Sequence, residues 1–239
     1  GFEIRCYGNT DGYIDLDTYG GTEAYSYAWT RDGVPISGTT ELTDLAAGSY
    51  GLTITDLNNC IKEYAFLLES PDSLALNAAP DFIECFGDTS SIYLSPTGGN
   101  TGGPYAYYWY GAGPSQSNLH GVSAGAYPVR VTDINNCFTE ETVELEESPE
   151  ILIALDVTSD YSGRGISCFG ETDGEITANV TGGRRNYLYD WEGIAGSDSV
   201  ISGLGEGWYL LTIEDDYGCL ADDSIFLQQP DSISLLTDS

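Results

Sequence analysis

Six cysteines are the residues of this chain best suited to chemistry, and they form two regularly spaced sets. The first set is spaced by 79 and 83 residues and comprises Cys6, Cys85 and Cys168. The second set is spaced by 77 and 82 residues and comprises Cys60, Cys137 and Cys219. Two cysteines per block of a small-domain array are typical of disulfides and of an oxidising compartment. A zinc site is disfavoured, because the chain has one histidine and no Cys-x-x-Cys motif.

Six cysteines allow fifteen complete pairings. Two patterns, one of them incomplete, follow the spacing. Pairing within blocks uses every thiol and joins Cys6 to Cys60, Cys85 to Cys137 and Cys168 to Cys219. Pairing between blocks joins Cys60 to Cys85 and Cys137 to Cys168, and it leaves Cys6 and Cys219 unpaired. We favour pairing within blocks, and free buried thiols are the alternative.

Oxygen-bearing side chains recur in the turn before each second cysteine and are the candidate calcium ligands. They are Asp56, Asn58, Asp133, Asn135 and Asp215. Calcium prefers hard oxygen ligands, and the chain is strongly acidic. Ordinary Asx-turn chemistry explains the same residues without any ion, and no EF-hand loop is present. We therefore expect no cofactor, with calcium as the one ligand to test.

A nucleophile-elbow pattern, Gly-x-Ser-x-Gly, occurs once, at residues 121–125, and His120 precedes it. Ser123 aligns with Ala46 and Gly205 of the other blocks, before a tyrosine and not between a strand and a helix. The paired acids at 215–216 and 222–223 are neighbours in sequence, so in a strand they point to opposite faces. We predict no catalytic residue and no enzymatic activity.

Composition excludes several classes of partner. The 239 residues carry 38 Asp and Glu against 7 Lys and Arg, a formal charge of −31. Such a surface repels phosphate backbones and anionic lipids, so we expect neither nucleic acid binding nor direct membrane insertion. The longest aliphatic run, residues 151–155, is far shorter than the roughly 20 residues of a membrane-spanning helix. Apolar residues make up 41% of the chain, which is enough for packed cores.

Matched landmarks divide the chain into three repeats of about 80 residues, the size of a small domain. Each repeat has a first cysteine, a Gly-Gly pair, an aromatic strand ending in tryptophan, and a proline at its close. We predict repeat 1 over 1–70, with its first strand missing, repeat 2 over 71–148 and repeat 3 over 149–229. Residues 230–239 then form a junction or the first strand of a following repeat. The opening Gly-Phe-Glu-Ile indicates a mature protein or an excised fragment.

Strand signals dominate each repeat. Residues 13–17 and 175–180 alternate with period two, and the aromatic strands place tyrosines and tryptophan on one face. Short strands separated by Gly and Asn turns indicate a β-sandwich, and a tyrosine after each Ala-Gly or Glu-Gly corner resembles the tyrosine corner of Ig-like domains. The expected core aromatics are Trp29, Trp109, Trp191, Tyr50, Tyr127 and Tyr209. A sugar-stacking role for the tryptophans is the alternative, and Tyr108 and Tyr110 are the expected outward aromatics.

The combined motif resembles the SprB repeat of giant gliding-motility adhesins. It reads Cys-x-Gly…Asp-Gly-x-Ile, Gly-Gly…Tyr-x-Tyr-x-Trp, Leu-x-x-Gly-x-Tyr…Thr-Asp…Cys, and repeat 2 departs from it with Ser90-Ser91 and an insertion at 101–103. The resemblance implies an elongated array of three tandem Ig-like β-sandwiches, exported by type IX secretion and displayed at the outer membrane.

The function expected from this resemblance is a non-catalytic stalk segment of a cell-surface adhesin filament, acting in surface attachment and gliding motility. Its partners would be neighbouring repeats and an extracellular surface or polysaccharide, and the fragment itself would be a monomer. The alternative is a set of carbohydrate-binding or accessory modules of a larger secreted protein.

Overall fold

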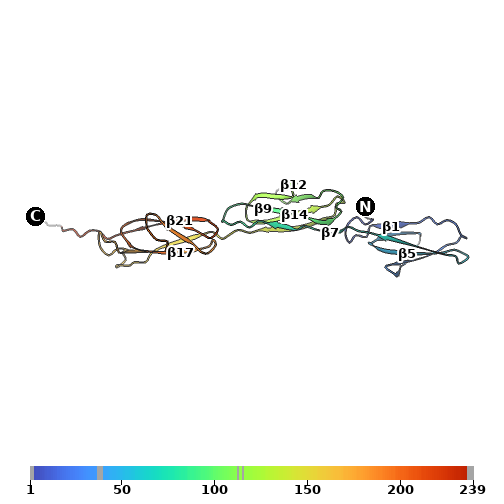
Figure 1. Cartoon of the computed structure of the whole chain (residues 1–239), viewed down its shortest axis with the longest axis horizontal. Coiled ribbons are helices and arrows are strands. Elements are labelled where there is room, and N and C mark those ends of the chain that lie inside the picture. Colours follow the sequence, from blue (N-terminus) through green and yellow to red (C-terminus); the bar gives the residue numbers. More distant parts are fainter. Residues whose placement is uncertain (1–2, 37–39, 112, 115, 236–239) are drawn as a thin grey trace. The chain divides into compact units, whose positions relative to one another are not determined.

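The computed structural model describes residues 3–36, 40–111, 113–114 and 116–235. Every regular element in this part of the chain is a β-strand (Figure 1). The described residues include no helix of the length and apolarity needed to cross a membrane. The predicted all-β class is confirmed.

Contacts group the chain into two compact units, which we describe separately. Unit 1 comprises Gly1–Pro80, Ile92–Leu119 and Ala126–Glu144. Unit 2 comprises Asp81–Ser91, His120–Gly125 and Leu145–Ser239. The division passes through repeat 2, so the units do not coincide with the three sequence repeats.

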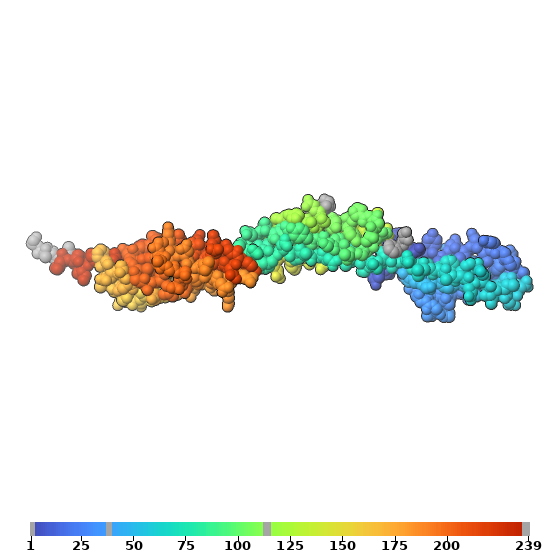
Figure 2. Space-filling view, in the orientation of Figure 1, coloured from blue at the N-terminus to red at the C-terminus, as the bar shows by residue number. Residues whose placement is uncertain are grey.

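Repeat 3 lies in unit 2 and shows the sandwich most completely. One sheet has the order β16-β17-β19 and consists of β16 (Leu152–Val157), β17 (Gly174–Thr181) and β19 (Val200–Leu204). The other has the order β18-β20-β21 and consists of β18 (Leu188–Trp191), β20 (Gly207–Glu214) and β21 (Leu220–Leu227). All neighbouring strands are antiparallel. The orange and red residues of this repeat gather into one body in the space-filling view (Figure 2).

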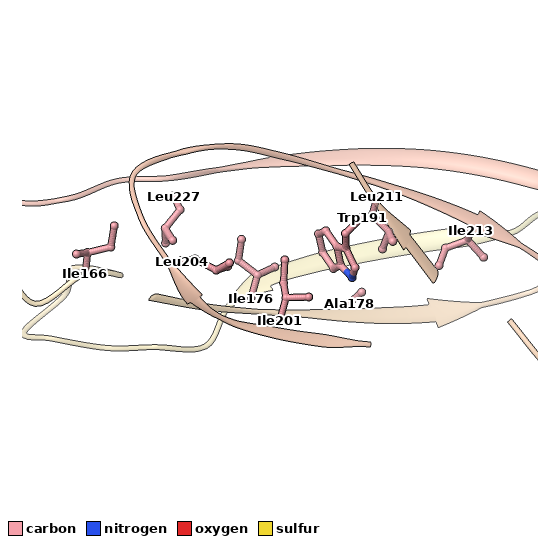
Figure 3. Packing of buried hydrophobic residues seen from close by; sticks show 9 residues of the cluster. All are labelled: Ile166, Ile176, Ala178, Trp191, Ile201, Leu204, Leu211, Ile213 and Leu227. Carbon is pink, nitrogen blue, oxygen red and sulfur yellow. The ribbon is translucent and has the colours of Figure 1, made fainter. Parts of the chain in front are cut away.

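The core of repeat 3 is filled from both sheets (Figure 3). The first sheet contributes Ile176 and Ala178 from β17 and Ile201 and Leu204 from β19. The second sheet contributes Trp191, Leu211, Ile213 and Leu227. Inward residues alternate with outward ones along β17, because successive side chains of a strand point to opposite faces. The predicted Ig-like sandwich is therefore confirmed at the level of packing.

Repeat 1 lies in unit 1 and has the same two layers. A four-stranded sheet has the order β3-β2-β5-β6 and consists of β3 (Val34–Ile36), β2 (Ser26–Arg31), β5 (Gly48–Thr55) and β6 (Ile61–Leu68). The facing sheet consists of β1 (Gly12–Asp15) and β4 (Glu41–Leu45). Among the described residues of repeat 1, no strand pairs with β1 in the way that β16 pairs with β17. The core includes Ile4, Trp29, Tyr50, Leu52 and Leu68.

Repeat 2 contributes strands to both units. Its largest sheet has the order β12-β11-β14-β15 and consists of β12 (Gly113–Pro114), β11 (Ala106–Trp109), β14 (Gly125–Thr132) and β15 (Phe138–Leu145). A second sheet has the order β13-β9-β8 and consists of β13 (Asn118–Val122), β9 (Ser90–Leu94) and β8 (Ala78–Pro80). The remaining pair is β10 (Thr97–Gly99) with β7 (Asp72–Ala75), the strand that follows Pro71.

Four of the six expected core aromatics are buried, and the other two are half-buried. Trp29, Trp109 and Trp191 are at most 2% exposed, and Tyr50 is 1% exposed. Tyr127 and Tyr209 are half-buried. The Tyr50 hydroxyl donates to the Ala46 carbonyl at 2.8 Å, and the Tyr209 hydroxyl donates to the Gly205 carbonyl at 2.9 Å. These bonds fix the chain where it enters β5 and β20, as a tyrosine corner does.

Candidate functional site

The loop that carries each first cysteine is anchored by a buried isoleucine two residues earlier. Ile4 is fully buried, and its N–H donates to the Glu69 carbonyl at 3.0 Å, beside the end of β6. Asn9 N–H then donates to the Cys6 carbonyl at 3.0 Å, which closes a tight turn. The Asp11 carboxylate accepts the Arg5 N–H at 3.1 Å, and this bond lowers the pKa of Asp11. The loop is therefore ordered by its own backbone bonds.

The turn that carries each second cysteine is organised by one aspartate. Asp56 Oδ1 accepts the N–H groups of Asn58 at 2.9 Å and Cys60 at 2.8 Å, and Oδ2 accepts Thr22 N–H at 3.0 Å. The Thr22 and Cys60 N–H groups lower the pKa of Asp56. Asp133 receives the same three bonds, its Oδ2 accepting Asn100 N–H at 2.7 Å.

Asp215 repeats this arrangement in a buried setting. Its side chain accepts N–H groups from Arg184 at 2.7 Å, Tyr217 at 2.9 Å and Cys219 at 3.0 Å. Burial raises the pKa of Asp215, but the backbone N–H groups outweigh it and hold the pKa below its ordinary value. All three turns thus present their cysteine on the same scaffold.

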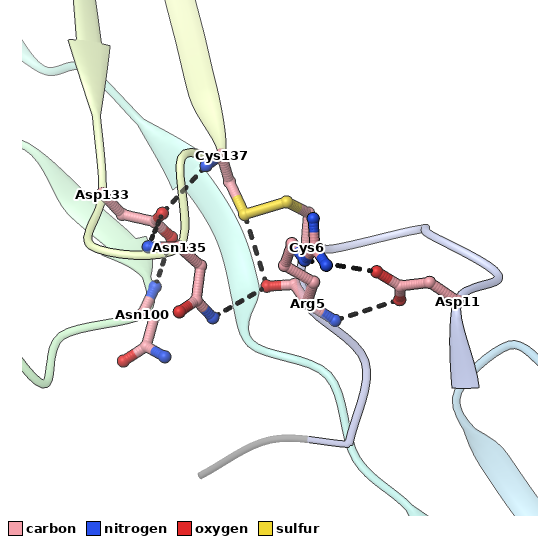
Figure 4. The surroundings of a disulfide bond; sticks show 7 residues. All are labelled: Arg5, Cys6, Asp11, Asn100, Asp133, Asn135 and Cys137. Atoms are coloured by element: carbon pink, nitrogen blue, oxygen red, sulfur yellow. Dashed lines mark hydrogen bonds and ion pairs between the residues drawn. A yellow bond between two sulfur atoms is a disulfide. The ribbon is translucent and has the colours of Figure 1, made fainter. Parts of the chain in front are cut away.

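Within unit 1, the first cysteine of repeat 1 bonds to the second cysteine of repeat 2 (Figure 4). The Cys6 and Cys137 Cα atoms are 5.6 Å apart, which is ordinary disulfide geometry. Asn135 Nδ2 donates to the Arg5 carbonyl at 3.2 Å and so braces the loop that carries Cys6. The disulfide therefore crosses the joint between repeats, in parallel with the peptide linker through Pro71.

Within unit 2, the pattern recurs one repeat further on. Cys85, the first cysteine of repeat 2, bonds to Cys219, the second cysteine of repeat 3, with Cα atoms 5.5 Å apart. Ile83 is buried and its N–H donates to the Glu146 carbonyl at 3.0 Å, as Ile4 does to Glu69. Two equivalent joints therefore carry equivalent disulfides, each joining a first cysteine to the second cysteine of the next repeat.

The predicted pairing within blocks is wrong, and so is the alternative pairing between blocks. Ile4 ties the Cys6 loop to the residue after β6, whereas Cys60 precedes the first residue of β6. An eight-residue strand at about 3.3 Å per residue separates the two by roughly 26 Å, far beyond the Cα separation that a disulfide permits. In repeat 3 the Cys168 loop is tied to Gln229, after β21, and Cys219 precedes β21. The strand length was the signal in the sequence that excludes pairing within a block.

Cys60 and Cys168 are left as free, exposed thiols. Cys60 is the second cysteine of repeat 1, and Cys168 is the first cysteine of repeat 3. Their equivalents in the other repeats form disulfides across a joint, whereas these two do not.

The SprB repeat family model matches residues 3–34 and 166–196. Repeats 1 and 3 therefore each contain a segment that matches the SprB repeat. Both matched segments begin at or just before the buried isoleucine that anchors a first-cysteine loop, and both extend past the core tryptophan, Trp29 or Trp191. The first-cysteine loops of Cys6 and Cys168 therefore lie within the matched segments. No curated protein matches the chain.

Solved structures similar to the chain include Ig-domain proteins. The N-terminal eight Ig domains of Down syndrome cell adhesion molecule match with 14% identity and a TM-score of 0.35, covering 95% of this chain and 35% of that one. The insect immune protein hemolin matches with 13% identity and a TM-score of 0.32, covering 96% and 73%. Bacteroides ovatus SGBP-B, solved with a mixed-linkage heptasaccharide, matches with 13% identity and a TM-score of 0.23, covering 96% and 69%. The chain spans about a third of the first of these, and the likenesses concern the fold alone.

The oxygen and amide groups of the calcium candidates make hydrogen bonds within the protein itself. Three of the four lone-pair positions on each of the carboxylates of Asp56, Asp133 and Asp215 accept backbone N–H groups. Asn58 and Asn135 use their amides to donate hydrogen bonds, to Thr22 Oγ1 and to the Arg5 carbonyl. Within the described ranges, no three His, Cys, Asp or Glu side chains cluster in a way that could hold a metal ion. The expectation of no cofactor, with calcium as the one ligand to test, stays a prediction.

The elbow-like segment of repeat 2 is part of a sheet. Residues 118–122 form β13, and β14 begins at Gly125, so Ser123 lies between two strands. His120 Nδ1 shares a hydrogen bond with Ser91 Oγ at 3.0 Å. Nucleophile-elbow chemistry depends on a turn between a strand and a helix, whereas Ser123 lies in a connection between two strands.

Two groups of aromatic side chains face outward on repeats 2 and 3. Tyr108 and Tyr110, which were expected there, are 44% and 43% exposed and meet edge to face with centroids 4.9 Å apart. The Tyr110 hydroxyl donates to Glu140, which also pairs with Arg130 at 2.7 Å. Sequence reasoning missed a second group on repeat 3, where Trp208 is 72% exposed and lies 5.4 Å from Phe226. Trp208 is the second residue of β20 and directly precedes the corner tyrosine, a position held by Ser49 and Ala126 in the other repeats.

Proposed function

We propose that this chain is a non-catalytic stalk segment of a bacterial cell-surface adhesin filament, acting in surface attachment and gliding motility. The polypeptide would be exported by type IX secretion and displayed at the outer membrane. The repeats would act as spacers that carry tension between the cell and the part of the adhesin that grips a surface.

The observation that supports this proposal best is the placement of the disulfides. A disulfide inside a domain protects that domain, whereas Cys6–Cys137 and Cys85–Cys219 each join two consecutive repeats. Every joint in the chain therefore has two covalent connections, the proline-containing linker and a cystine. A stalk under tension can extend at its joints, and a second covalent connection limits that extension.

The SprB repeats support the same class of function, since the resemblance is to the tandem repeats of gliding adhesins. Three copies of one fold that share their joint residues suit a spacer, which needs each copy only to fold and to join the next. Disulfides also suit a protein that works in an oxidising space outside the cytoplasm.

The decisive tests are a gene deletion and protease treatment in cells, together with small-angle scattering of the purified protein. Deletion of the parent gene should reduce surface attachment and gliding, and protease added to intact wild-type cells should remove the repeats while leaving a cytoplasmic marker intact. Small-angle scattering of the oxidised chain should report an elongated monomer. Normal attachment and gliding in the deletion strain would contradict the adhesin role, and a compact particle would contradict the spacer role.

A carbohydrate-binding function is the second candidate, and Trp208 is the observation that favours it. A large exposed indole beside Phe226 on neighbouring antiparallel strands is a surface on which a sugar ring could stack. A glycan array should then show binding that Trp208→Ala abolishes. Trp191→Phe is an unsuitable control because Trp191 is buried, so Tyr64→Ala, an exposed aromatic of repeat 1, serves instead.

A further inference from the structure

The two free cysteines are complementary halves of one joint. Cys168 is a first cysteine, the equivalent of Cys6 and Cys85, and both of those form disulfides. Cys60 is a second cysteine, the equivalent of Cys137 and Cys219, and both of those also form disulfides. In each existing joint a first cysteine bonds to a second cysteine, never to its own kind.

The Cys168 loop already has the structure of the two bonded loops. Ile166 is fully buried like Ile4, and Glu171 N–H donates to the Cys168 carbonyl at 3.2 Å, as Asp88 N–H does to the Cys85 carbonyl. Ser167 N–H donates to Asp173 at 3.0 Å, matching the bond from Arg5 N–H to Asp11. The loop is therefore set for a disulfide, and its thiol is exposed.

The Cys60 turn has the structure of the two bonded turns but lacks the brace across the joint. Asn135 donates its amide to the Arg5 carbonyl, next to the bonded Cys6. The equivalent Asn58 donates its amide to Thr22 Oγ1 at 2.9 Å, within its own repeat. Docking of a first-cysteine loop against Cys60 would offer Asn58 the acceptor that Asn135 already has.

The surface at the first glycine of each Gly-Gly pair, which we call the slot, is covered in repeats 2 and 3 and open in repeat 1. At Gly98 an added Cβ would lie 2.0 Å from the Ser73 carbonyl oxygen, and at Gly182 it would lie 1.7 Å from that of Glu150. The incoming linker therefore packs directly on these glycines. At Gly20, which has the same positive φ, no described atom lies within 4 Å of the added Cβ. Tyr25, Tyr105 and Tyr187 each donate a hydroxyl hydrogen bond to the carbonyl of this glycine, so the three slots are built alike.

The segment that fits this slot is the tail of the same chain. Residues 230–235 read Pro-Asp-Ser-Ile-Ser-Leu, and the linker at 71–76 reads Pro-Asp-Ser-Leu-Ala-Leu. In the linker, residues 72–75 form β7 against β10, and Leu76 is 3% exposed. In the tail, Ile233 and Leu235 are fully exposed or nearly so, at 102% and 89%. The tail carries the apolar pattern of a docked linker without a sheet partner among the described residues.

We propose that two copies of this chain join head to tail, Cys168 of one copy forming a disulfide with Cys60 of the other. The tail of the first copy then occupies the Gly20 slot of the second, which reproduces the joints at Cys137 and Cys219. This inference rests on the geometry of the joints and stands apart from the adhesin proposal. The group that completes the joint of Cys168 is a turn of the Cys60 type, which a second copy of this chain supplies.

The bond forms by thiol–disulfide exchange with a small disulfide oxidant such as oxidised glutathione. The Cys168 thiolate attacks the oxidant, forming a mixed disulfide and releasing one glutathione thiol. The Cys60 thiolate of the second copy then attacks the mixed disulfide and releases the second thiol. Two protein thiols lose two electrons and two protons, and one glutathione disulfide becomes two glutathione molecules.

The test uses two full-length variants that each keep one free thiol. Cys60→Ser retains only Cys168, and Cys168→Ser retains only Cys60. The two are mixed in equal amounts, one labelled with nitrogen-15, in a glutathione redox buffer at 0.15 M salt. Intact mass of the cross-linked species separates the heterodimer from both homodimers, and peptide mapping identifies the bonded cysteines. Random pairing would give twice as much heterodimer as either homodimer, and we expect at least tenfold more.

A second measurement isolates the tail. Ile233→Asp should slow heterodimer formation at least tenfold when placed in the partner that carries Cys168, because an apolar contact is lost. Leu188→Asp, at a residue 62% exposed on β18, is the matched control and should leave the rate unchanged. Statistical proportions of the three dimers, no cross-link at all, or an intrachain Cys60–Cys168 bond in the wild-type chain would each overturn the proposal.

Discussion

A single aspartate organises the turn before each second cysteine, and Asp215 shows its effect most clearly. Its buried carboxylate accepts three backbone N–H groups that would otherwise lack an acceptor. Because a buried donor without a partner is costly, the side chain stabilises the turn, and through the turn it positions Cys219 for its disulfide.

Asp215→Asn should lower the stability of repeat 3 by about 1–3 kcal/mol, since the amide replaces a charged acceptor and places a donor against Arg184 N–H. For a domain of this size each kcal/mol corresponds to roughly 4–8 °C in Tm. Differential scanning calorimetry measures the shift. Asp231→Asn removes the same charge from the exposed tail and should leave Tm unchanged; an equal shift in both variants would show that charge, not hydrogen bonding, is responsible.

Acid should weaken the same turns. The pKa of Asp56 is lowered by the Thr22 and Cys60 N–H groups, and that of Asp215 is lowered by its backbone donors against the opposing effect of burial. A carboxyl whose pKa is lower in the folded state stabilises the fold above its unfolded pKa of about 3.9 and loses that effect as the pH falls through the folded value. Tm should therefore fall below about pH 5, and Asp215→Asn should fall less steeply than wild type. Parallel curves would contradict this assignment.

Calcium is expected to leave Tm unchanged. Calcium takes six to eight oxygen ligands, whereas each turn aspartate already has three backbone hydrogen bonds. Thermal melts in chelator and in millimolar calcium provide the measurement, with magnesium as the control for ionic strength. A rise in Tm that calcium produces and magnesium does not would establish a structural site.

At the scale of the element, each sandwich depends on one aromatic strand. Trp191 closes β18, is 1% exposed, and donates its indole N–H to the Asp198 carbonyl at 3.1 Å. Trp109 makes the equivalent bond to the Gln116 carbonyl at 3.0 Å. The tryptophan therefore joins its strand to the following loop while it fills the core.

Trp191→Phe should destabilise repeat 3 by about 1–3 kcal/mol, because it leaves a cavity and an unpaired carbonyl. Trp208→Phe makes the same chemical change at a side chain that is 72% exposed and should cost under about 0.5 kcal/mol. Urea denaturation followed by tyrosine and tryptophan fluorescence compares the two. Similar losses in both variants would mean that the core does not depend on Trp191.

At the scale of the whole molecule, the disulfides shorten the covalent path between the ends. The shortest route from Cys6 to Cys219 crosses to Cys137, follows the chain back to Cys85 and crosses again. Only 52 residues of repeat 2 lie on that route, out of the 213 that separate Cys6 from Cys219 along the chain. Most of repeats 1 and 3 is therefore bypassed when the chain is pulled from its ends.

Force spectroscopy should reveal this bypass. Pulled from its termini, the oxidised chain should reach about a third of the length of the reduced chain, since maximum extension scales with the residues on the shortest route. A Cys60→Ser, Cys168→Ser double variant should behave as the oxidised wild type, because neither cysteine lies in a disulfide of this chain. Full extension of the oxidised chain would show that the two cystines are absent in solution.

The sequence by itself determined the features that are encoded locally or by repetition. Period-two alternation predicted the strands, aligned landmarks predicted three repeats, and the aromatic strand predicted that Trp29, Trp109 and Trp191 are buried. The strand and core predictions succeed because a strand exposes one face to the core, so its side chains record which face that is. The bounds of the three repeats stay a prediction.

The tertiary structure alone decided which cysteines meet. Counting thiols favoured pairing within a repeat, but an eight-residue strand holds Cys6 and Cys60 at opposite ends of their sandwich. The chain leaves repeat 1 beside the Cys6 loop and enters repeat 2 beside the Cys137 turn, so the disulfide forms across the joint. Spacing along the sequence cannot show this, because a disulfide depends on the distance between two Cα atoms in the folded array and not on the number of residues between them.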